Sequence, residues 1–516
     1  MQELPIGIQD FVMLRQDGLL YVDKTERLLE LIKNGRRYFL SRPRRFGKSL
    51  TLSTLEAMFK GCFHLFKGLK AEKWVEEQAN RPAPVLRFDM SSCENGSVEL
   101  FRQSLTEMLL RKARQFEVTL HSQTLTGMFA DLIEEVYKLH GYAAVLIDEY
   151  DKPILDNIND LEKVELLRTL LRSFYGALKG CDEYLRFIMF TGISKFSKVG
   201  VFSALNNLED ISMDEAFGDI VGYTQDELEF FLADRIDYAA KKMKIGKDNL
   251  LTNLKEYYDG FSFDGKVKLY NPFSIMQCLK KCEFNNYWYE SGSPSFIVEW
   301  MKNHKIEAPE EYRHKTVKND FVSSQEIEHA DPSSFLFQSG YLTVEKKQEQ
   351  LLTLDYPNRE VLDSLSSMYL KLIYKVENYA SLGHKLWSAL HKGDIAETVK
   401  LYNTALAGIA YDDYNANRNE FWYRSMFIML LRGAGIISYN EPHTSKGRAD
   451  VVIQFENQTI VLEFKFAEKS SETKKKKQEG LSQMSGREYA AAYCAEGRKI
   501  IAAVLIADDE TRSVTL

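Results

Sequence analysis

The stretch Ser41-Arg42-Pro43-Arg44-Arg45-Phe46-Gly47-Lys48-Ser49 decides the fold of the first part of the chain. An apolar strand pattern ends immediately before it, and a helical pattern begins immediately after it. This order directs backbone N–H groups and the positive end of a helix toward a phosphate group. Gly47 permits close approach, the Lys48 ammonium reaches the β- and γ-phosphate oxygens, and the Ser49 hydroxyl ligates Mg²⁺. The stretch therefore predicts a site for ATP and Mg²⁺ in which the phosphates are contacted by Arg45, Phe46, Gly47, Lys48, Ser49 and Leu50.

The loop departs in one place from the pattern GxxxxGK[ST], because Arg42 stands where the first glycine is expected. A side chain at this position must adopt a loop conformation that glycine adopts more easily. We expect Arg42, Arg44 and Arg45 to add positive charge that compensates for the missing glycine.

A second motif supports the nucleotide site. The apolar run Val145-Leu146-Ile147 leads directly into Asp148-Glu149, which is typical of a buried strand that ends in carboxylates. Asp148 is expected to hold Mg²⁺ through water, and Glu149 is expected to polarise the attacking water. A pair of acidic residues that simply faces solvent is the alternative.

A third apolar run, Phe187 to Phe190, is followed by Thr191 and, three residues later, Ser194. Thr191 is the candidate for sensing the γ-phosphate between the two motifs, and Ser194 is the alternative. A strand-end hydroxyl that bonds only to its own backbone stays equally open. The sequence does not choose an arginine finger among Arg168, Arg172 and Arg186.

The coarse pattern divides the chain into four segments. Residues 1–220 alternate short apolar runs with amphipathic helices, which predicts an α/β core with a parallel sheet. Residues 221–320 are richer in helical patterns and aromatic residues, and we expect a helical lid. Residues 321–410 combine helices with a hairpin whose strands lie at 341–344 and 351–354, either as a winged-helix-like element or as a simple connector. Residues 411–516 predict a second α/β domain.

The second domain carries a constellation of carboxylates and a lysine. We expect a helix at 419–432, strands at 449–453, 459–464 and 500–506, and a helix at 480–495. Glu463 and Lys465 fall on one face of their strand, and a hairpin brings Asp450 beside them. Two carboxylates with a lysine can hold a divalent metal and orient water for attack on a phosphodiester. The further contributors are Glu420 on the preceding helix, Gln483 on the following helix, and Gly447-Arg448 as a turn with a phosphate contact. An exposed hairpin with ordinary charged residues is the alternative.

Bulk properties limit the class of protein. The chain has 516 residues and a formal net charge of −7, which argues against a uniformly basic nucleic-acid binder but allows a local basic groove. The six cysteines include no CxxC pair, so we expect a reducing compartment and no structural zinc site. The sequence has no signal peptide pattern and no apolar run long enough to span a membrane, so we expect a cytoplasmic protein.

These motifs together resemble the AAA-ATPase-like family of gut bacteria. The resemblance rests on the Arg42-containing loop, on Tyr21-Val22-Asp23-Lys24-Thr25, on Asp148-Glu149-Tyr150-Asp151 and on Thr191-Gly192-Ile193-Ser194. It implies an AAA-like P-loop NTPase core in which an arginine at position 42 is usual. It also implies that Tyr21 to Thr25 wrap the adenine. The tail is similar to the PD-(D/E)xK nuclease superfamily, which implies a restriction-endonuclease-like domain.

The leading hypothesis is an ATPase that controls a metal-dependent DNA nuclease. Lys48, Ser49, Asp148 and Glu149 then serve ATP and Mg²⁺, whereas Asp450, Glu463 and Lys465, assisted by Glu420, cut DNA. Asp450 and Glu463 are the expected metal ligands. The alternative is a nucleotide-dependent switch whose tail only binds nucleic acid or a protein partner. A ring or a dimer of identical chains is compatible with such an ATPase, and the sequence does not decide between DNA and RNA.

Overall fold

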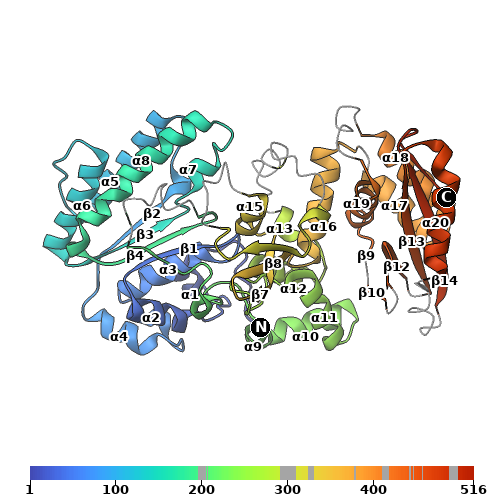
Figure 1. Cartoon of the computed structure of the whole chain (residues 1–516). Coiled ribbons are helices and arrows are strands. Elements are labelled where there is room, and N and C mark those ends of the chain that lie inside the picture. Colours follow the sequence, from blue (N-terminus) through green and yellow to red (C-terminus); the bar gives the residue numbers. More distant parts are fainter. Residues whose placement is uncertain are drawn as a thin grey trace. The chain divides into compact units, whose positions relative to one another are not determined.

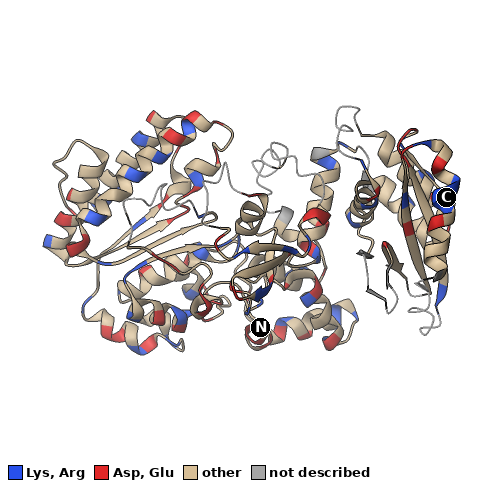
Figure 2. Cartoon of the chain, in the orientation of Figure 1, with Lys and Arg blue, Asp and Glu red and all other residues tan. Residues whose placement is uncertain are grey.

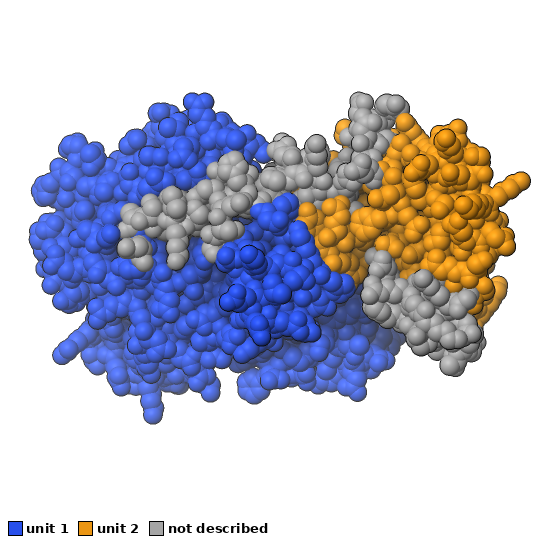
Figure 3. Space-filling model, in the orientation of Figure 1, with its two compact units in different colours: residues 1–300, 314–360 blue, residues 301–313, 361–516 orange. Residues whose placement is uncertain are grey.

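The structure is a computed structural model that describes residues 1–195, 205, 207–290, 301, 309–322, 331–376, 379–409, 418–440, 443–444, 447–455, 457–486 and 498–516. The chain divides into two compact units (Figure 3). The first unit comprises residues 1–300 and 314–360, and the second comprises residues 301–313 and 361–516. The division into four segments predicted from the sequence is finer than these two units and stays a prediction.

The first unit is built on a five-stranded parallel sheet with the strand order β2-β3-β4-β1-β5. The sheet is buried because its central strands are nearly continuous apolar runs, as parallel sheets require. Strand β4 lies between β1 and β3, so the two motif-bearing strands flank the strand that ends at Thr191 and Gly192. The strands are β1 (Arg37–Ser41), β2 (Val85–Asp89), β3 (Ala143–Asp148), β4 (Leu185–Gly192) and β5 (Glu209–Asp210).

Helices cover both faces of this sheet (Figure 1). Helix α3 packs on one face, and α5, α6 and α8 form the layer on the other face. Both basic and acidic residues occur along α5, α6 and α8, so these helices carry mixed charge (Figure 2). The helices up to β4 are α1 (Phe11–Gln16), α2 (Thr25–Asn34), α3 (Lys48–Phe59), α4 (Glu72–Ala79), α5 (Val98–Gln115), α6 (Leu125–His140), α7 (Lys152–Leu155) and α8 (Leu161–Gly180).

The rest of the first unit is a helical cluster beside a small antiparallel sheet. The apolar residues Leu4, Leu20 and Val22 of the N-terminal segment pack into the core of the helical cluster. The cluster contains α9 (Gln225–Phe231), α10 (Ala233–Met243), α11 (Lys247–Tyr258), α12 (Pro272–Lys281) and α13 (Tyr287–Glu290). The small sheet follows the order β6-β8-β7, with α15 (Pro332–Ser339) before its hairpin, and its strands are β6 (Lys315–Lys318), β7 (Thr343–Gln348) and β8 (Leu351–Asp355).

The predicted hairpin is confirmed, because β7 and β8 pair antiparallel. Sequence reasoning missed β6, which adds a third strand by pairing with β8. Its residues Lys-Thr-Val-Lys alternate between half-buried and exposed positions and form no apolar run, so no strong pattern marked them.

The second unit is a mixed sheet with helices on both faces (Figure 1). The strand order is β15-β14-β13-β12-β9; β13 and β14 are parallel, and the other pairs are antiparallel. The strands are β9 (Ser438–Asn440), β12 (Val451–Gln454), β13 (Gln458–Ala467), β14 (Lys499–Asp508) and β15 (Ser513–Thr515), with β10 (His443–Thr444) and β11 (Gly447–Arg448) as a separate pair. Helix α20 lies on one face, and α19 lies on the other. The helices are α16 (Arg359–Met368), α17 (Tyr379–Lys392), α18 (Ile395–Ala407), α19 (Glu420–Gly433) and α20 (Thr473–Gly486).

The boundaries of the second unit differ from prediction mainly at α20. This helix begins at Thr473, so it includes the four lysines 474–477 before the predicted start at 480, and residues 487–495 lie outside the described part. A buried ion pair of 2.8 Å between Arg432 and Glu310 joins α19 to the segment at 309–313, which explains why this segment belongs to the second unit. Among the described helices, none has the length and apolar character that crossing a lipid bilayer requires.

Candidate functional site

The first candidate site is the loop between β1 and α3. Gly47 has φ of 98° and is the residue before the helix, so it uses a left-handed conformation that favours glycine. Arg45 also has a positive φ, of 69°. The buried Lys48 ammonium donates hydrogen bonds to the carbonyl oxygens of Arg42 (2.8 Å) and Pro43 (2.9 Å), and burial lowers its pKa. The loop is therefore folded around the lysine, with the N–H groups of the first turn of α3 directed into the loop.

Arg42 does not supply charge to this site, which corrects the expectation from the sequence. Its guanidinium is buried and donates to the carbonyl oxygens of Ser41 (3.0 Å), Ser212 and Phe217 (3.4 Å). It also lies over the ring of Phe263 at 4.2 Å. Its φ is not positive, so arginine occupies the position without the strain that we expected. Arg42 therefore connects the loop to the segment around residue 212. The positive charge at the loop comes from neighbouring residues instead. Arg45, in contrast, is exposed.

The carboxyl ends of β3 and β4 bring Asp148 and Thr191 together. The Thr191 hydroxyl donates to Asp148 Oδ1 at 2.6 Å, and the Glu149 backbone N–H donates to the same oxygen at 3.0 Å. Within the described residues no hydrogen bond reaches Asp148 Oδ2, so this oxygen suits a hydrated Mg²⁺. Glu149 has a positive φ of 48°, and burial raises the pKa of its carboxyl group. Thr191, at the end of β4, thus bonds to the Asp148 side chain at the end of the neighbouring strand β3.

Asp151 is a buried carboxylate at this edge that sequence reasoning did not assign to the site. It accepts hydrogen bonds from the backbone N–H groups of Ile193 (2.9 Å) and Ser194 (2.6 Å), and from the Ser194 hydroxyl (2.7 Å). The alternative sensor Ser194 is therefore held by Asp151. Gly192 ends β4 beside these groups, since a Cβ there would fall 2.6 Å from the Tyr150 ring and 2.7 Å from Asp151 Oδ1. Asp151 therefore holds the segment that follows β4 in place. Its position three residues after Asp148 is the sequence feature from which a place at the site could have been predicted.

A cavity of about 380 Å³ lies against the loop, within the first unit. Its lining includes residues 44–51 of the loop and Glu149. It also includes apolar and aromatic side chains from the N-terminal segment and the helical cluster, among them Tyr21, Val22, Tyr223, Phe273 and Met276. A phosphate-binding loop together with apolar side chains suits a nucleotide with its base. Tyr21, Val22 and Lys24 line the cavity, and a contact of Tyr21 to Thr25 with adenine stays a prediction.

The second candidate site lies at the ends of β12 and β13. These strands pair antiparallel with Val451 opposite Leu462, so Asp450 and Glu463 follow as neighbours. Asp450 Oδ2 accepts a hydrogen bond from the Phe464 backbone N–H at 2.7 Å. The Lys465 ammonium lies 2.9 Å from Glu463 Oε1 and 3.8 Å from Glu420 Oε1, and Glu420 comes from the first turn of α19. The hairpin and the first turn of α19 therefore bring together the four residues that the sequence singled out.

The electrostatics of this cluster suit a divalent cation. Glu463 is buried, and its Oε2 has no hydrogen-bond partner among the described residues. Burial raises the pKa of Glu463 to about 7, with the Asp450 charge adding to the effect. Burial also raises the pKa of Glu420. A buried carboxylate oxygen without a partner is costly unless a cation or water satisfies it. The oxygen donors of Asp450 and Glu463 are of the kind that Mg²⁺ and Mn²⁺ prefer.

Further residues surround the cluster. Arg424, one turn after Glu420 on α19, pairs with Asp450 at 2.8 Å, and sequence reasoning did not identify it. Its spacing of four residues from Glu420, which places both on one face of the helix, is the sequence feature from which its position could have been predicted. Gly480 lets α20 approach β14 and the stem of Lys465, because a Cβ there would fall 2.5 Å from Val504 and 3.4 Å from Lys465. Gln483 lies on α20 with a half-buried side chain, and the side chain of Arg448 lies outside the described residues.

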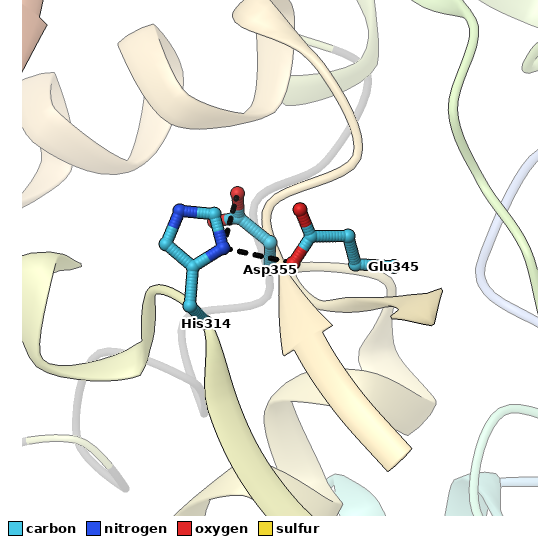
Figure 4. A group of neighbouring side chains, drawn as sticks. All are labelled: His314, Glu345 and Asp355. Carbon is cyan, nitrogen blue, oxygen red and sulfur yellow. Dashed lines mark hydrogen bonds and ion pairs between the residues drawn. The ribbon is translucent and has the colours of Figure 1, made fainter. Parts of the chain in front are cut away.

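A third cluster, at one end of the small sheet, joins His314, Glu345 and Asp355 (Figure 4). His314 Nδ1 lies 2.8 Å from Glu345 Oε2 and 3.8 Å from Asp355 Oδ2. Glu345 sits at an irregularity between Val344 and Lys346 that turns it toward the other two. His314 and Glu345 are exposed, and the imidazole already bonds to a carboxylate. The imidazole therefore has a hydrogen-bond partner without an ion, and the geometry identifies no ligand.

Comparison with known proteins assigns a family to each of two regions of the chain. Residues 5–202 match the family model described as predicted AAA-ATPase, and residues 418–515 match that of the PD-(D/E)XK nuclease superfamily. A similar protein from Azotobacter chroococcum mcd 1, named "Uncharacterized protein in vnfD 5'region", is 33% identical over 510 residues, which cover 97% of this chain and 95% of that protein. These matches confirm the resemblance drawn from the motifs. The chain belongs to the predicted AAA-ATPase family and carries a C-terminal domain of the PD-(D/E)XK nuclease superfamily.

Proposed function

We propose that the first unit binds and hydrolyses ATP with Mg²⁺. The loop at 44–49 receives the phosphates, and the Lys48 ammonium exchanges its two carbonyl partners for phosphate oxygens. Ser49 and Asp148 would hold the Mg²⁺ ion, which neutralises charge on the phosphates. Glu149, whose pKa is raised by burial, would accept the proton of the attacking water. Thr191 would report the γ-phosphate through its 2.6 Å hydrogen bond to Asp148.

We propose that the second unit is a metal-dependent DNA nuclease. The observation that carries this proposal is the convergence of Asp450, Glu463, Lys465 and Glu420, including a buried carboxylate oxygen of Glu463 without a partner. Asp450 and Glu463 would hold a divalent cation, which supplies an activated water and stabilises charge on the phosphate. Lys465 would orient that water and stabilise the developing negative charge. Glu420 would hold Lys465 in place from α19.

ATP binding would then control cleavage, since one chain carries both sites. The second candidate function is a nucleotide-dependent switch whose C-terminal domain binds nucleic acid or a protein without cutting. The net charge of −7 favours this candidate, because nucleic-acid affinity depends strongly on positive charge.

Nucleotide binding is tested by Lys48→Ala. The variant should lose ATP binding in equilibrium dialysis, because the Lys48 ammonium is proposed to bind the phosphate oxygens. Lys60→Ala is the matched control: this lysine follows the same helix and forms an exposed pair with Glu56 at 2.6 Å. Unchanged ATP affinity in Lys48→Ala would refute the assignment of the loop.

Nuclease activity is tested by cleavage of plasmid and single-stranded DNA with Mg²⁺ or Mn²⁺. Cleavage should require the metal and should vanish in Asp450→Ala. Asp509→Ala serves as the control, since Asp509 pairs with Arg418 at 3.0 Å in the same unit and touches none of the four residues in any described contact. If the wild-type chain cuts neither substrate while it hydrolyses ATP, the binding-only switch replaces the nuclease.

A further inference from the structure

Arg424 pairs with Asp450, which is one of the two carboxylates proposed to bind the divalent cation. Its Nη1 donates to Asp450 Oδ1 at 2.8 Å, and both side chains are nearly buried, with 11% and 12% of their surface exposed. The second oxygen of Asp450 accepts the Phe464 backbone N–H. In the chain without nucleic acid, each oxygen of Asp450 therefore already has a partner.

The ion pair between Arg424 and Asp450 determines the charge that an approaching cation meets at Asp450. Three carboxylates (Asp450, Glu463 and Glu420) face two cations, Lys465 and Arg424. Lys465 is shared between Glu463 and Glu420, so Arg424 is the cation that neutralises Asp450. A divalent cation that approaches Asp450 meets a like charge at close range, in a site where water screens poorly.

Arginine also suits a different partner. Its planar guanidinium forms paired hydrogen bonds with phosphate oxygens, and it keeps its charge in partly buried sites. Arg424 lies four residues from Glu420 on the same face of α19 and pairs with Asp450, so it adjoins the carboxylates at which the proposed reaction places the phosphodiester.

We propose that Arg424 is a positioning residue that couples entry of the nucleic-acid phosphate to binding of the divalent cation. In the free chain it pairs with Asp450 and weakens cation binding. When a phosphodiester enters, the guanidinium transfers to the phosphate oxygens and releases Asp450 to the cation. By linkage, the phosphodiester and the cation then strengthen one another's binding by the same factor. This inference rests on the proposed nuclease function.

The test measures Mn²⁺ affinity by electron paramagnetic resonance on the full chain without ATP. Asp450→Asn defines which part of the binding belongs to this site. Arg424→Gln should bind Mn²⁺ about tenfold more tightly than wild type, because one adjacent positive charge is removed. Arg418→Gln removes the same charge from the ion pair with Asp509 and should leave the affinity unchanged.

A DNA duplex with phosphorothioate linkages, which keep the negative charge and resist hydrolysis, provides the second arm. It should tighten Mn²⁺ binding in the wild type and have little effect in Arg424→Gln. Arg424→Lys keeps the charge without the paired geometry, so its affinity should stay weak and its response to DNA should be smaller. If Arg424→Gln does not fold, Arg424→Lys provides the test instead.

The outcomes separate this inference from the nuclease proposal. Unchanged or weaker Mn²⁺ binding in Arg424→Gln, with the Asp450-dependent binding intact, would overturn the role of Arg424 alone. An equal response to DNA in wild type and Arg424→Gln would also overturn it. Mn²⁺ binding that does not depend on Asp450 would overturn both proposals.

Discussion

Replacing Glu463 with glutamine should make the metal-free chain more stable at pH 8. Glu463 is 1% exposed, one of its oxygens lacks a hydrogen-bond partner, and burial raises its pKa to about 7. An ionised carboxylate is therefore held in an environment that favours the protonated form. Glutamine has nearly the same shape and is neutral at every pH.

The size and the sign follow from the two pKa values. In the unfolded chain the group titrates near 4.5. Between pH 4.5 and 7 the folded chain keeps a proton that the unfolded chain has released, so rising pH favours unfolding. Stability from this group is complete below pH 4.5 and is lost as pH rises to 7. The loss amounts to about 3 kcal/mol, since each pH unit across this interval costs roughly 1.4 kcal/mol.

Urea unfolding of metal-free wild type and Glu463→Gln between pH 5 and pH 8 measures this difference. The two proteins should differ by less than about 1 kcal/mol at pH 5, and the variant should be more stable by up to about 3 kcal/mol at pH 8. Glu397→Gln, on α18 of the same unit, removes a carboxylate that pairs with Lys400 and should show no such dependence. A Glu463→Gln variant that is less stable than wild type at pH 8 would show that ionised Glu463 does not destabilise the metal-free chain.

Three further predictions concern the first unit. Arg42→Ala should lower the free energy of unfolding by roughly 3 kcal/mol in urea titrations, because buried carbonyl groups lose a charged donor. The exposed Arg45→Ala should not, and full stability with lost ATP affinity in Arg42→Ala would contradict this role. Gly192→Ala should lower kcat for ATP more than ATP affinity, since the added Cβ meets the Tyr150 ring at 2.6 Å; unchanged kcat would show that the β4 end is adaptable. Thr191→Val should reduce kcat about tenfold or more in a coupled ATPase assay at similar KM, and a change in KM alone would argue for a binding role.

The central features of the fold could be predicted because they depend on local patterns. The apolar runs that end at Leu40 and Asp148 belong to buried parallel strands, and their order along the chain indicated an α/β unit. The hairpin that joins Asp450 to Glu463 followed from strand periodicity. Strands of two to four residues, such as β5, β6 and β15, were missed because so few residues carry no measurable period.

The remaining features depend on contacts that are distant in sequence. Arg42 was expected at the phosphates, but its partners Ser212 and Phe217 lie about 170 residues away, so no local pattern revealed its burial. The cavity beside the loop is lined in part by Tyr223 and Phe273 of the helical cluster, which are also distant from the loop in sequence. The spacing of Arg424 from Glu420 could have been recognised in the sequence, but only the structure showed that Arg424 pairs with Asp450.

Control of cleavage by ATP is tested most directly by the rate of DNA cleavage with and without ATP in wild type, Glu149→Gln and Asp450→Ala. Wild type should show metal-dependent cleavage whose rate changes with ATP, Glu149→Gln should alter that change, and Asp450→Ala should show no cleavage. Cleavage that persists in Asp450→Ala, or that ignores ATP in a chain that still hydrolyses it, would contradict the claim that the first unit controls a nuclease in the second.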